Sequence, residues 1–174
     1  MNAEVGKPGR LLGWIKTGFI YLVVLSVGGA AANVWMTRDQ YTGPVPAIQT
    51  VDVSGRSHSI GPNSSSNPQV IYFFAEWCPI CKGQNGAMSS IADDYQVLGI
   101  AMQSGNDQKV RGYLEQQAID FPVINDESGA LTRTFGVHGV PATFVVDRQG
   151  QVRFSTRGLS PQPALRLRLW MSSL

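Results

Sequence analysis

Residues 73–83 of the chain read FFAEWCPICKG, and this stretch contains both of its cysteines. The residues just before it overlap it as VIYFF at 70–74, a continuous apolar run bounded by turn signals, which predicts a buried central strand. If the chain leaves this strand by Trp77 and a helix starts near Pro79, Cys78 lies at the helix N-terminus. Unpaired amide groups and the helix dipole stabilise a thiolate at such a position.

Cys81 follows Cys78 by one helical turn, which is close enough for the two to form a small disulfide. This spacing indicates a reversible two-electron switch, in which Cys78 attacks a substrate disulfide and Cys81 resolves the mixed disulfide. A purely structural bridge is the weaker interpretation, because so short a loop stabilises a fold little. A metal site needs further ligands, and the two histidines, His58 and His138, lack zinc-finger spacing to the pair.

The rest of the chain beyond residue 50 alternates short apolar runs with segments of helical spacing. A weak alternation over 48–60 suggests a strand or hairpin, and 61–68 is expected to be a loop. Asp107 and Ser128 are predicted to cap helices. We expect strands at 97–102, 121–124, 143–146 and 152–155, and helices at 79–95, 107–118, 129–135 and after Ser160. This order predicts an α/β sandwich with a mixed sheet.

The N-terminal region is predicted to be a membrane anchor. Residues 17–35, TGFIYLVVLSVGGAAANVW, carry no charge and are long enough to cross a hydrocarbon core. We therefore expect a cytoplasmic segment at 1–16, a transmembrane helix at 17–36, a linker at 37–49 and an exported domain at 50–174, oriented by the positive-inside rule. The alternative is a signal peptide cleaved after Ala32. Both interpretations export the domain, which in a bacterium with two membranes means the periplasm.

Charge is unevenly divided along the chain. The net charge of the whole chain is +2, and four basic residues against one acidic residue give the first 38 residues a balance of +3. The nearly neutral remainder gives no electrostatic reason to expect nucleic acid as a partner. The last acidic residue is Asp147, and the arginines after it are interpreted as a solvated basic face: Arg148, Arg153, Arg157, Arg166 and Arg168.

Two motifs carry a resemblance to a known family. AEWCPIC at 75–81 resembles the active-site stretch of the thioredoxin superfamily, and GVHGVPATFVVDRQGQV at 136–152 resembles the stretch with the family's cis-proline and the hairpin after it. The resemblance covers about residues 45–174 and implies a thioredoxin-like three-layer sandwich with a mixed central sheet. The anchor and FPVINDESGALTRTFGV at 121–137 resemble the membrane-tethered periplasmic TlpA/ResA/CcmG group, and most closely its suppressor-of-copper-sensitivity, or ScsD, type.

The resemblance assigns roles to residues of both motifs. It implies that Cys78 is the nucleophile, Cys81 the resolving cysteine and Pro141 the cis-proline beside them. Val140 would offer backbone hydrogen bonds to an extended substrate segment. Trp77 is expected to shield the disulfide and to contact substrates. The residues expected to shape the active site are Trp77, Pro79, Ile80, Val140 and Pro141.

The chain also departs from the family pattern. Thioredoxin has a buried acid where this chain has Tyr72, and the cytochrome-maturation relatives have a glutamate where it has Gln84. The acid credited with deprotonating the resolving thiol is therefore missing from both places. Glu76 is the nearest carboxylate and is expected to lie at the surface. These differences argue against a dedicated role in apocytochrome maturation.

The predicted function is a thiol-disulfide oxidoreductase of the bacterial inner membrane, a single-pass protein with its catalytic domain in the periplasm. It would reduce or isomerise disulfides of exported proteins, with electrons from a membrane reductant of the DsbD type, and copper stress is a setting that creates wrong disulfides. No cofactor is expected. One alternative is a copper metallochaperone that uses Cys78, Cys81 and His138. A peroxide-reducing enzyme is the weaker alternative, because a peroxidatic cysteine normally stands alone.

Overall fold

The computed structural model describes residues 9–38, 40–62 and 67–173. The chain forms two compact units, Met1–Arg38 and Asp39–Leu174, which are described separately. Residues 1–8 of the predicted cytoplasmic segment and residues 63–66 of the predicted loop at 61–68 lie outside the described residues.

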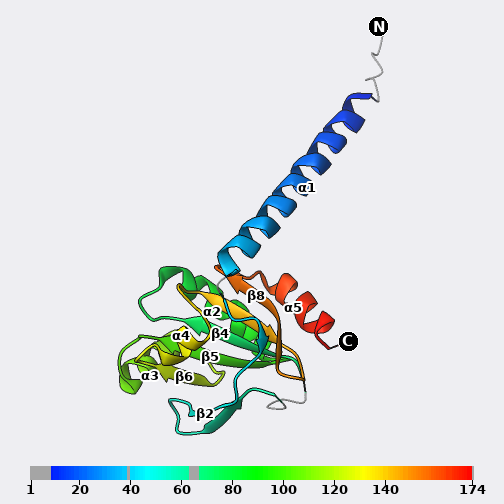
Figure 1. Cartoon of the computed structure of the whole chain (residues 1–174). Helices are drawn as coiled ribbons and strands as arrows, with labels where there is room; N and C mark the ends of the chain where they lie inside the picture. Colours follow the sequence, from blue (N-terminus) through cyan, green and yellow to red (C-terminus); the bar gives the residue numbers. More distant parts are fainter. Residues whose placement is uncertain (1–8, 39, 63–66, 174) are drawn as a thin grey trace. The chain divides into compact units, whose positions relative to one another are not determined.

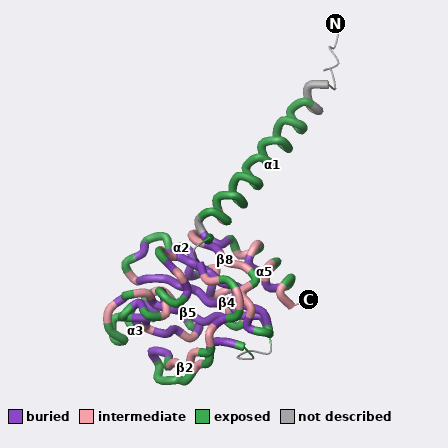
Figure 2. The backbone as a smooth tube through the Cα atoms, viewed as in Figure 1, coloured by how far each residue is buried: buried purple, intermediate pink, exposed green. Residues whose placement is uncertain are grey.

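The described part of the first unit is one helix, α1 (Gly9–Thr37). Its stretch Gly13–Trp35 is long and apolar enough to cross a membrane, with a mean hydropathy of 1.6 over its most apolar part. The large apolar side chains described in this stretch are exposed, as Figure 2 shows for most of the helix. A helix that exposes apolar side chains on all sides is typical of a segment that needs lipid or another apolar partner around it.

The second unit is built on a six-stranded mixed sheet (Figure 1). The strand β4 (Gln69–Phe74) lies inside the sheet and is buried along its whole length, as the apolar run predicted. It pairs in parallel with one neighbour and antiparallel with the other. From edge to edge the strands are β1 (Gly43–Pro44), β8 (Gln151–Arg157), β7 (Ala142–Val146), β4, β5 (Gln96–Met102) and β6 (Val123–Asp126).

Helices cover both faces of this sheet. Residues of β4 alternate between two apolar clusters, since successive side chains of a strand point to opposite faces. Tyr72 and Phe74 belong to the cluster shared with the helices α2 (Pro79–Ala92), α3 (Asp107–Gln116) and α5 (Gln162–Met171). Ile71 and Phe73 belong to the other cluster, on the face of the short helix α4 (Ala130–Thr134). The result is the predicted three-layer α/β sandwich.

Residues that were expected to form a linker at 37–49 are partly built into the domain. Gly43 pairs with Val152 of β8, and Val45 is buried among the residues of the second cluster. A separate hairpin of β2 (Ile48–Val51) and β3 (Ser57–Ile60) confirms the weak alternation at 48–60. The compact unit therefore begins at Asp39 rather than at residue 50.

Two helix caps differ from the predictions. The side chain of Asn106, and not that of Asp107, caps α3 by accepting a hydrogen bond from the amide of Lys109. At α4 the expected cap Ser128 accepts only from the amide of Ala130, at 3.3 Å. The buried carboxylate of Asp126 accepts from the amides of Leu131 and Thr132 instead. A carboxylate has two acceptor atoms with a full charge, so it satisfies the free amides of a helix start better than a hydroxyl does.

Two boundaries also differ from the predictions. The strand expected at 121–124 is β6 (Val123–Asp126), because Pro122 has no N–H to donate to the sheet. Helix α2 ends at Ala92, before the predicted end at Tyr95.

The last segment, LRLRLW, alternates like a strand but forms α5, as its prolines favoured. Leu165 and Leu169, one helical turn apart, are its buried contacts.

Candidate active site

Cys78 caps helix α2, as its place before Pro79 predicted. Its backbone is extended, with φ −94° and ψ 108°, and Pro79 follows at the first turn of the helix. The sulfur of Cys78 accepts a hydrogen bond from the amide of Cys81 at 3.2 Å, and the two cysteines form a disulfide with their Cα atoms 5.3 Å apart. The free amide at the start of the helix is therefore directed at the first sulfur of the pair, where it can stabilise a thiolate.

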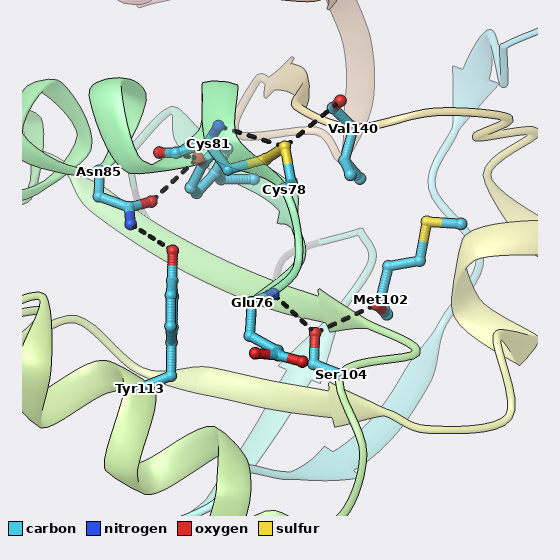
Figure 3. Close-up of a disulfide and its surroundings, with 9 residues drawn as sticks. Glu76, Cys78, Cys81, Asn85, Met102, Ser104, Tyr113 and Val140 are labelled. Carbon is cyan, nitrogen blue, oxygen red and sulfur yellow. Dashed lines mark hydrogen bonds between the residues drawn. A yellow bond between two sulfur atoms is a disulfide. The ribbon is translucent and has the colours of Figure 1, made fainter.

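The second motif reaches the disulfide from the opposite side (Figure 3). The Cys78 sulfur lies 3.7 Å from the carbonyl oxygen of Val140, which is 62 residues away in sequence. The Val140–Pro141 peptide bond is cis, in agreement with the resemblance. The carbonyl of Pro141 accepts a hydrogen bond from the amide of Gly158, which fixes this loop to the end of β8. The fold thus brings together the two motifs that the sequence showed far apart.

The surroundings of the disulfide are apolar and partly exposed. Cys81 is fully buried and Cys78 is 4% exposed, whereas Trp77 and Ile80 are 53% and 56% exposed. The indole N–H of Trp77 donates to the carbonyl of Gln103 at 3.2 Å, which holds the ring at the surface. Trp77 and Ile80 are therefore placed to present apolar surface beside the reactive sulfur, while their roles in substrate contact stay predictions.

A neutral hydrogen-bonded chain includes Tyr72, at the position where the resemblance to thioredoxin implied an acid. The hydroxyl of Tyr72 lies 3.1 Å from Oδ1 of Asn85 and 3.4 Å from the carbonyl oxygen of Cys81. The amide nitrogen of Asn85 donates to the hydroxyl of Tyr113 at 3.0 Å, as Figure 3 shows. Burial raises the pKa of Tyr72 far above its ordinary value, with a smaller contribution from Tyr113. The hydroxyl of Tyr72 therefore stays protonated. The hydrogen-bonded groups next to Cys81 include no carboxylate that could act as its base.

The two remaining polar positions near the site have structural partners. The amide side chain of Gln84 is buried and exchanges two hydrogen bonds with the backbone of Ser160. The carboxylate of Glu76 forms an ion pair with Lys109, and its backbone N–H donates to the hydroxyl of Ser104 at 3.1 Å (Figure 3). The closest carboxylate in sequence is therefore directed to a lysine, as expected for a surface residue.

The histidines do not join the cysteines. The ring of His58 contacts Asp52 at 2.8 Å, and His138 is exposed. Within the described parts of the chain, no three side chains of His, Cys, Asp or Glu gather closely enough to hold a metal ion. The copper alternative through Cys78, Cys81 and His138 therefore gains no support from the geometry.

Sequence reasoning missed Asn85, which links Tyr72 to Tyr113. An asparagine in the middle of a helix carries no signal by itself, because its spacing fits a buried face and its type fits a solvated one. Both of its partners come from other elements, one from β4 and one from α3, so only the folded chain shows its role.

Comparison with known proteins identifies the family. Residues 42–155 match the model of the AhpC/TSA family. The chain belongs to this family. It is 30% identical over 126 residues to a thioredoxin-like protein of Haemophilus influenzae, an alignment that covers 72% of this chain and 75% of the relative. It is also 26% identical to the thiol:disulfide interchange protein DsbE of Escherichia coli, over 68% of this chain and 66% of that protein.

A solved structure gives the same result for the fold. The thiol:disulfide interchange protein of the thioredoxin family from Chlorobium tepidum superposes with a TM-score of 0.65 and 26% identity, covering 78% of this chain and 99% of that one. The fold is thioredoxin-like, as the two motifs implied. Together with the Cys78–Cys81 disulfide, these relatives support a thiol-disulfide oxidoreductase. The closer likeness to the ScsD type stays a prediction.

Proposed function

We propose that the protein is a membrane-tethered oxidoreductase that reduces or isomerises disulfides in exported proteins. The observation that carries the proposal is the Cys78–Cys81 disulfide at the start of α2, in contact with the loop of Val140 and Pro141. The E. coli relative is a thiol:disulfide interchange protein, which supports the same chemistry for this chain.

The reaction follows from the positions of the two sulfurs. In the reduced protein, the Cys78 thiolate attacks a substrate disulfide, forms a mixed disulfide and releases one substrate thiolate. The Cys81 thiolate then attacks the Cys78 sulfur, which releases the second substrate thiolate and closes the Cys78–Cys81 disulfide. Two electrons have moved from the pair to the substrate. If a different substrate thiolate first attacks the substrate sulfur of the mixed disulfide, it forms a new substrate disulfide and releases the Cys78 thiolate, with no net electron transfer.

The order of attack is supported by the environment of each sulfur. Cys78 accepts the hydrogen bond of the Cys81 amide and lies between exposed apolar residues. Cys81 is fully buried, and its neighbours are the neutral hydroxyl of Tyr72 and the amide of Asn85. Burial without a compensating charge raises the pKa of a thiol, so we expect Cys78 to be the thiolate that meets the substrate.

The direction of electron flow is inferred from weak thiolate stabilisation. Pro79 and Ile80, between the cysteines, carry no charge or side-chain donor, and Lys82 is exposed. An exposed helix terminus contributes about 0.3–1 kcal/mol, so the thiolate is stabilised only modestly and the pair should be relatively reducing. A reducing protein in an oxidising compartment needs a donor, and we propose a membrane reductant of the DsbD type.

The proposed cellular location follows from α1. The apolar stretch Gly13–Trp35 would anchor the protein in the inner membrane, with the N-terminus in the cytoplasm and the thioredoxin-like domain in the periplasm.

The reduction potential of the Cys78–Cys81 pair tests the proposal. The full chain in detergent would be equilibrated with glutathione buffers, and the fraction of disulfide measured by thiol alkylation. We expect a potential nearer that of thioredoxin or disulfide isomerase, between about −270 and −180 mV. A potential close to about −120 mV would mark a strong oxidant and overturn the reducing role.

A further inference from the structure

The outward face of helix α5 is apolar. Its buried side carries Leu165 and Leu169, as expected for a helix that packs on a sheet. The exposed side carries residues three and four positions apart, which form one stripe along the helix. We call this set the α5 stripe: Pro163, Leu167, Trp170 and Met171. Leu167 is 54% exposed, Trp170 56% and Met171 40%.

The polar residues of α5 are turned toward the domain and do not cover the stripe. Gln162 donates to the hydroxyl of Ser90 at 2.7 Å, and Arg166 binds the carboxylate of Asp94 at 2.6 Å. On the opposite flank, Arg168 donates to the hydroxyl of Thr156. A surface helix normally shows its polar residues to water. In α5 they line the two edges of an apolar face, a pattern that marks an interaction site.

The sequence that contains the stripe is basic. Residues 148–173 contain five arginines and no acidic residue. Arg153 and Arg166 pair with carboxylates, whereas Arg148, Arg157 and Arg168 have no carboxylate partner among the residues that the structure describes. A cavity of about 550 Å³ at the end of the stripe is lined by Asp147, which pairs with Arg153, and by Arg148, Gln149, Phe154, Met171 and Ser172. The guanidinium of Arg148 donates there to the carbonyl of Ser173 at 2.5 Å, a neutral acceptor.

The chain enters the domain through β1, at the edge of the sheet where β8 contacts α5. Gly43 of β1 pairs with Val152 of β8, and β8 contacts α5 through Thr156 and Phe154. Only residues 36–38 separate the end of the candidate membrane span from the start of the domain unit, at most roughly 10 Å of extended chain. Given the proposed membrane anchor, on which this step rests, the domain is tethered to a lipid surface by a short connection.

We propose that the α5 stripe docks on an anionic phospholipid surface. Leu167, Trp170 and Met171 enter the level of the headgroups and upper acyl chains, where indole rings and apolar side chains of interfacial helices lie. Arg148 binds lipid phosphate beside them. A second copy of the chain fits the stripe less well. One face of a helix about 15 Å long offers much less area than the ~800 Å² that each partner buries in a stable interface. Docking would hold the domain in one orientation on the bilayer.

The test uses the full chain in nanodiscs and quenching of tryptophan by brominated lipids. The chain has four tryptophans, so variants with phenylalanine at the other three positions isolate each one. Trp77 is the matched control for Trp170, because its exposure in the domain is nearly equal, 53% against 56%, but it lies beside the disulfide. Trp35, at the end of the candidate span, reports on the anchor itself. Each variant is measured in discs of phosphatidylglycerol and of phosphatidylcholine.

We expect Trp170 to lose roughly half of its emission in anionic discs with brominated chains, since interfacial helices insert about 5–10 Å. Trp77 should keep its emission, and the double variant Leu167→Ser/Met171→Ser or Arg148→Gln should reduce the Trp170 loss. If Trp35 is quenched and Trp170 is not, the docking proposal is wrong while the anchor stands. If Trp35 is not quenched, the anchor and this inference both fail. Protection of Trp170 only in discs that hold two copies would show that a second chain, and not lipid, covers the stripe.

Discussion

Gln84 and Ser160, 76 residues apart in the chain, exchange two hydrogen bonds inside the domain. Nε2 of Gln84 donates to the carbonyl of Ser160 at 2.9 Å, and its Oε1 accepts from the amide of Ser160 at 2.8 Å. Both residues are 2% exposed. The side chain therefore ties the helix that carries the cysteines to the segment that leads into α5, and it needs a donor and an acceptor at once to do so.

The variant Gln84→Glu is expected to lose about 1–3 kcal/mol of unfolding free energy at neutral pH, because an ionised carboxylate cannot donate to Ser160. Burial raises the pKa of the new carboxyl above the unfolded value of about 4.3. The penalty should therefore grow as pH rises above that value and shrink below it, where the protonated group can donate. Denaturant unfolding at about pH 4 and pH 7.5 measures the difference. The exposed control Gln149→Glu should change little, and equal losses for Gln84→Glu at both pH values would contradict the argument.

The two cysteines are expected to behave differently when each is removed. Cys81→Ala should accumulate mixed disulfides with substrate proteins, because no resolving thiol remains to displace the substrate from Cys78. Cys78→Ala should trap few, since Cys81 is fully buried. Non-reducing gels of membranes after acid quenching count the adducts. Equal trapping by the two variants would contradict the assignment of Cys78 as the nucleophile.

Asp52, in the β2–β3 hairpin connection, should stabilise the domain in a pH-dependent way. Burial raises its pKa, but hydrogen bonds from Ser54, His58 and Arg56 outweigh burial and bring the pKa well below the ordinary value. The stabilisation is then fully present above the unfolded pKa of about 3.9 and is lost as pH falls below it. Asp52→Asn should cost about 1.5–3 kcal/mol near pH 7 and less near pH 2.

Unfolding curves of Asp52→Asn at several pH values measure this dependence. Asp120→Asn is the matched control, because Asp120 is exposed and its replacement should change the unfolding free energy little at any pH. A loss for Asp52→Asn that does not vary with pH would show that the ionised carboxylate is not the stabilising form.

Tyr72 is expected to position the active site without exchanging protons. Its pKa is raised by burial far above the ordinary value, so the hydroxyl remains protonated while the enzyme works. Tyr72→Phe removes a partner of Asn85 and should cost about 1–3 kcal/mol of stability. The pH dependence of disulfide reduction should keep its shape, measured on a small disulfide peptide with the full chain in detergent. A midpoint that moves in Tyr72→Phe but not in the control Tyr95→Phe would show that Tyr72 does take part in proton transfer.

The orientation of the anchor can be measured in cells. Alkaline phosphatase fused after Gly43 should be active and bound to the membrane, because the fusion point would follow an uncleaved span in the periplasm. A fusion cleaved after Ala32 would be active but soluble and shorter. An inactive membrane-bound fusion would place this side of the span in the cytoplasm.

The centre of the fold was predictable because its signals are local and strong. The apolar run VIYFF, bounded by turn signals, predicted a buried strand, and Pro79 after Cys78 predicted the start of a helix. The thioredoxin-like motifs then indicated that Val140 and Pro141 reach the first sulfur. Each of these predictions depends on a few consecutive residues.

The features that the sequence did not predict depend on partners far along the chain. Asp126 competes successfully with Ser128 for the amides of α4 because β6 ends with its carboxylate beside them. Asn85 and Gln84 are placed in a helix face by spacing alone, but their partners Tyr113 and Ser160 come from elements that only folding brings close. Polar side chains gain their roles from such distant partners, so residue type and spacing do not reveal them.

The presence of just two cysteines has a consequence for the maturation of the protein itself. Four cysteines could pair in three ways, whereas two permit a single intramolecular bridge. A newly exported copy can therefore be oxidised at any stage of folding without being locked into a wrong topology, since the only ring it can close spans one helical turn at the start of α2. An enzyme proposed to repair the mispaired cysteines of other proteins thus needs no such repair within its own chain.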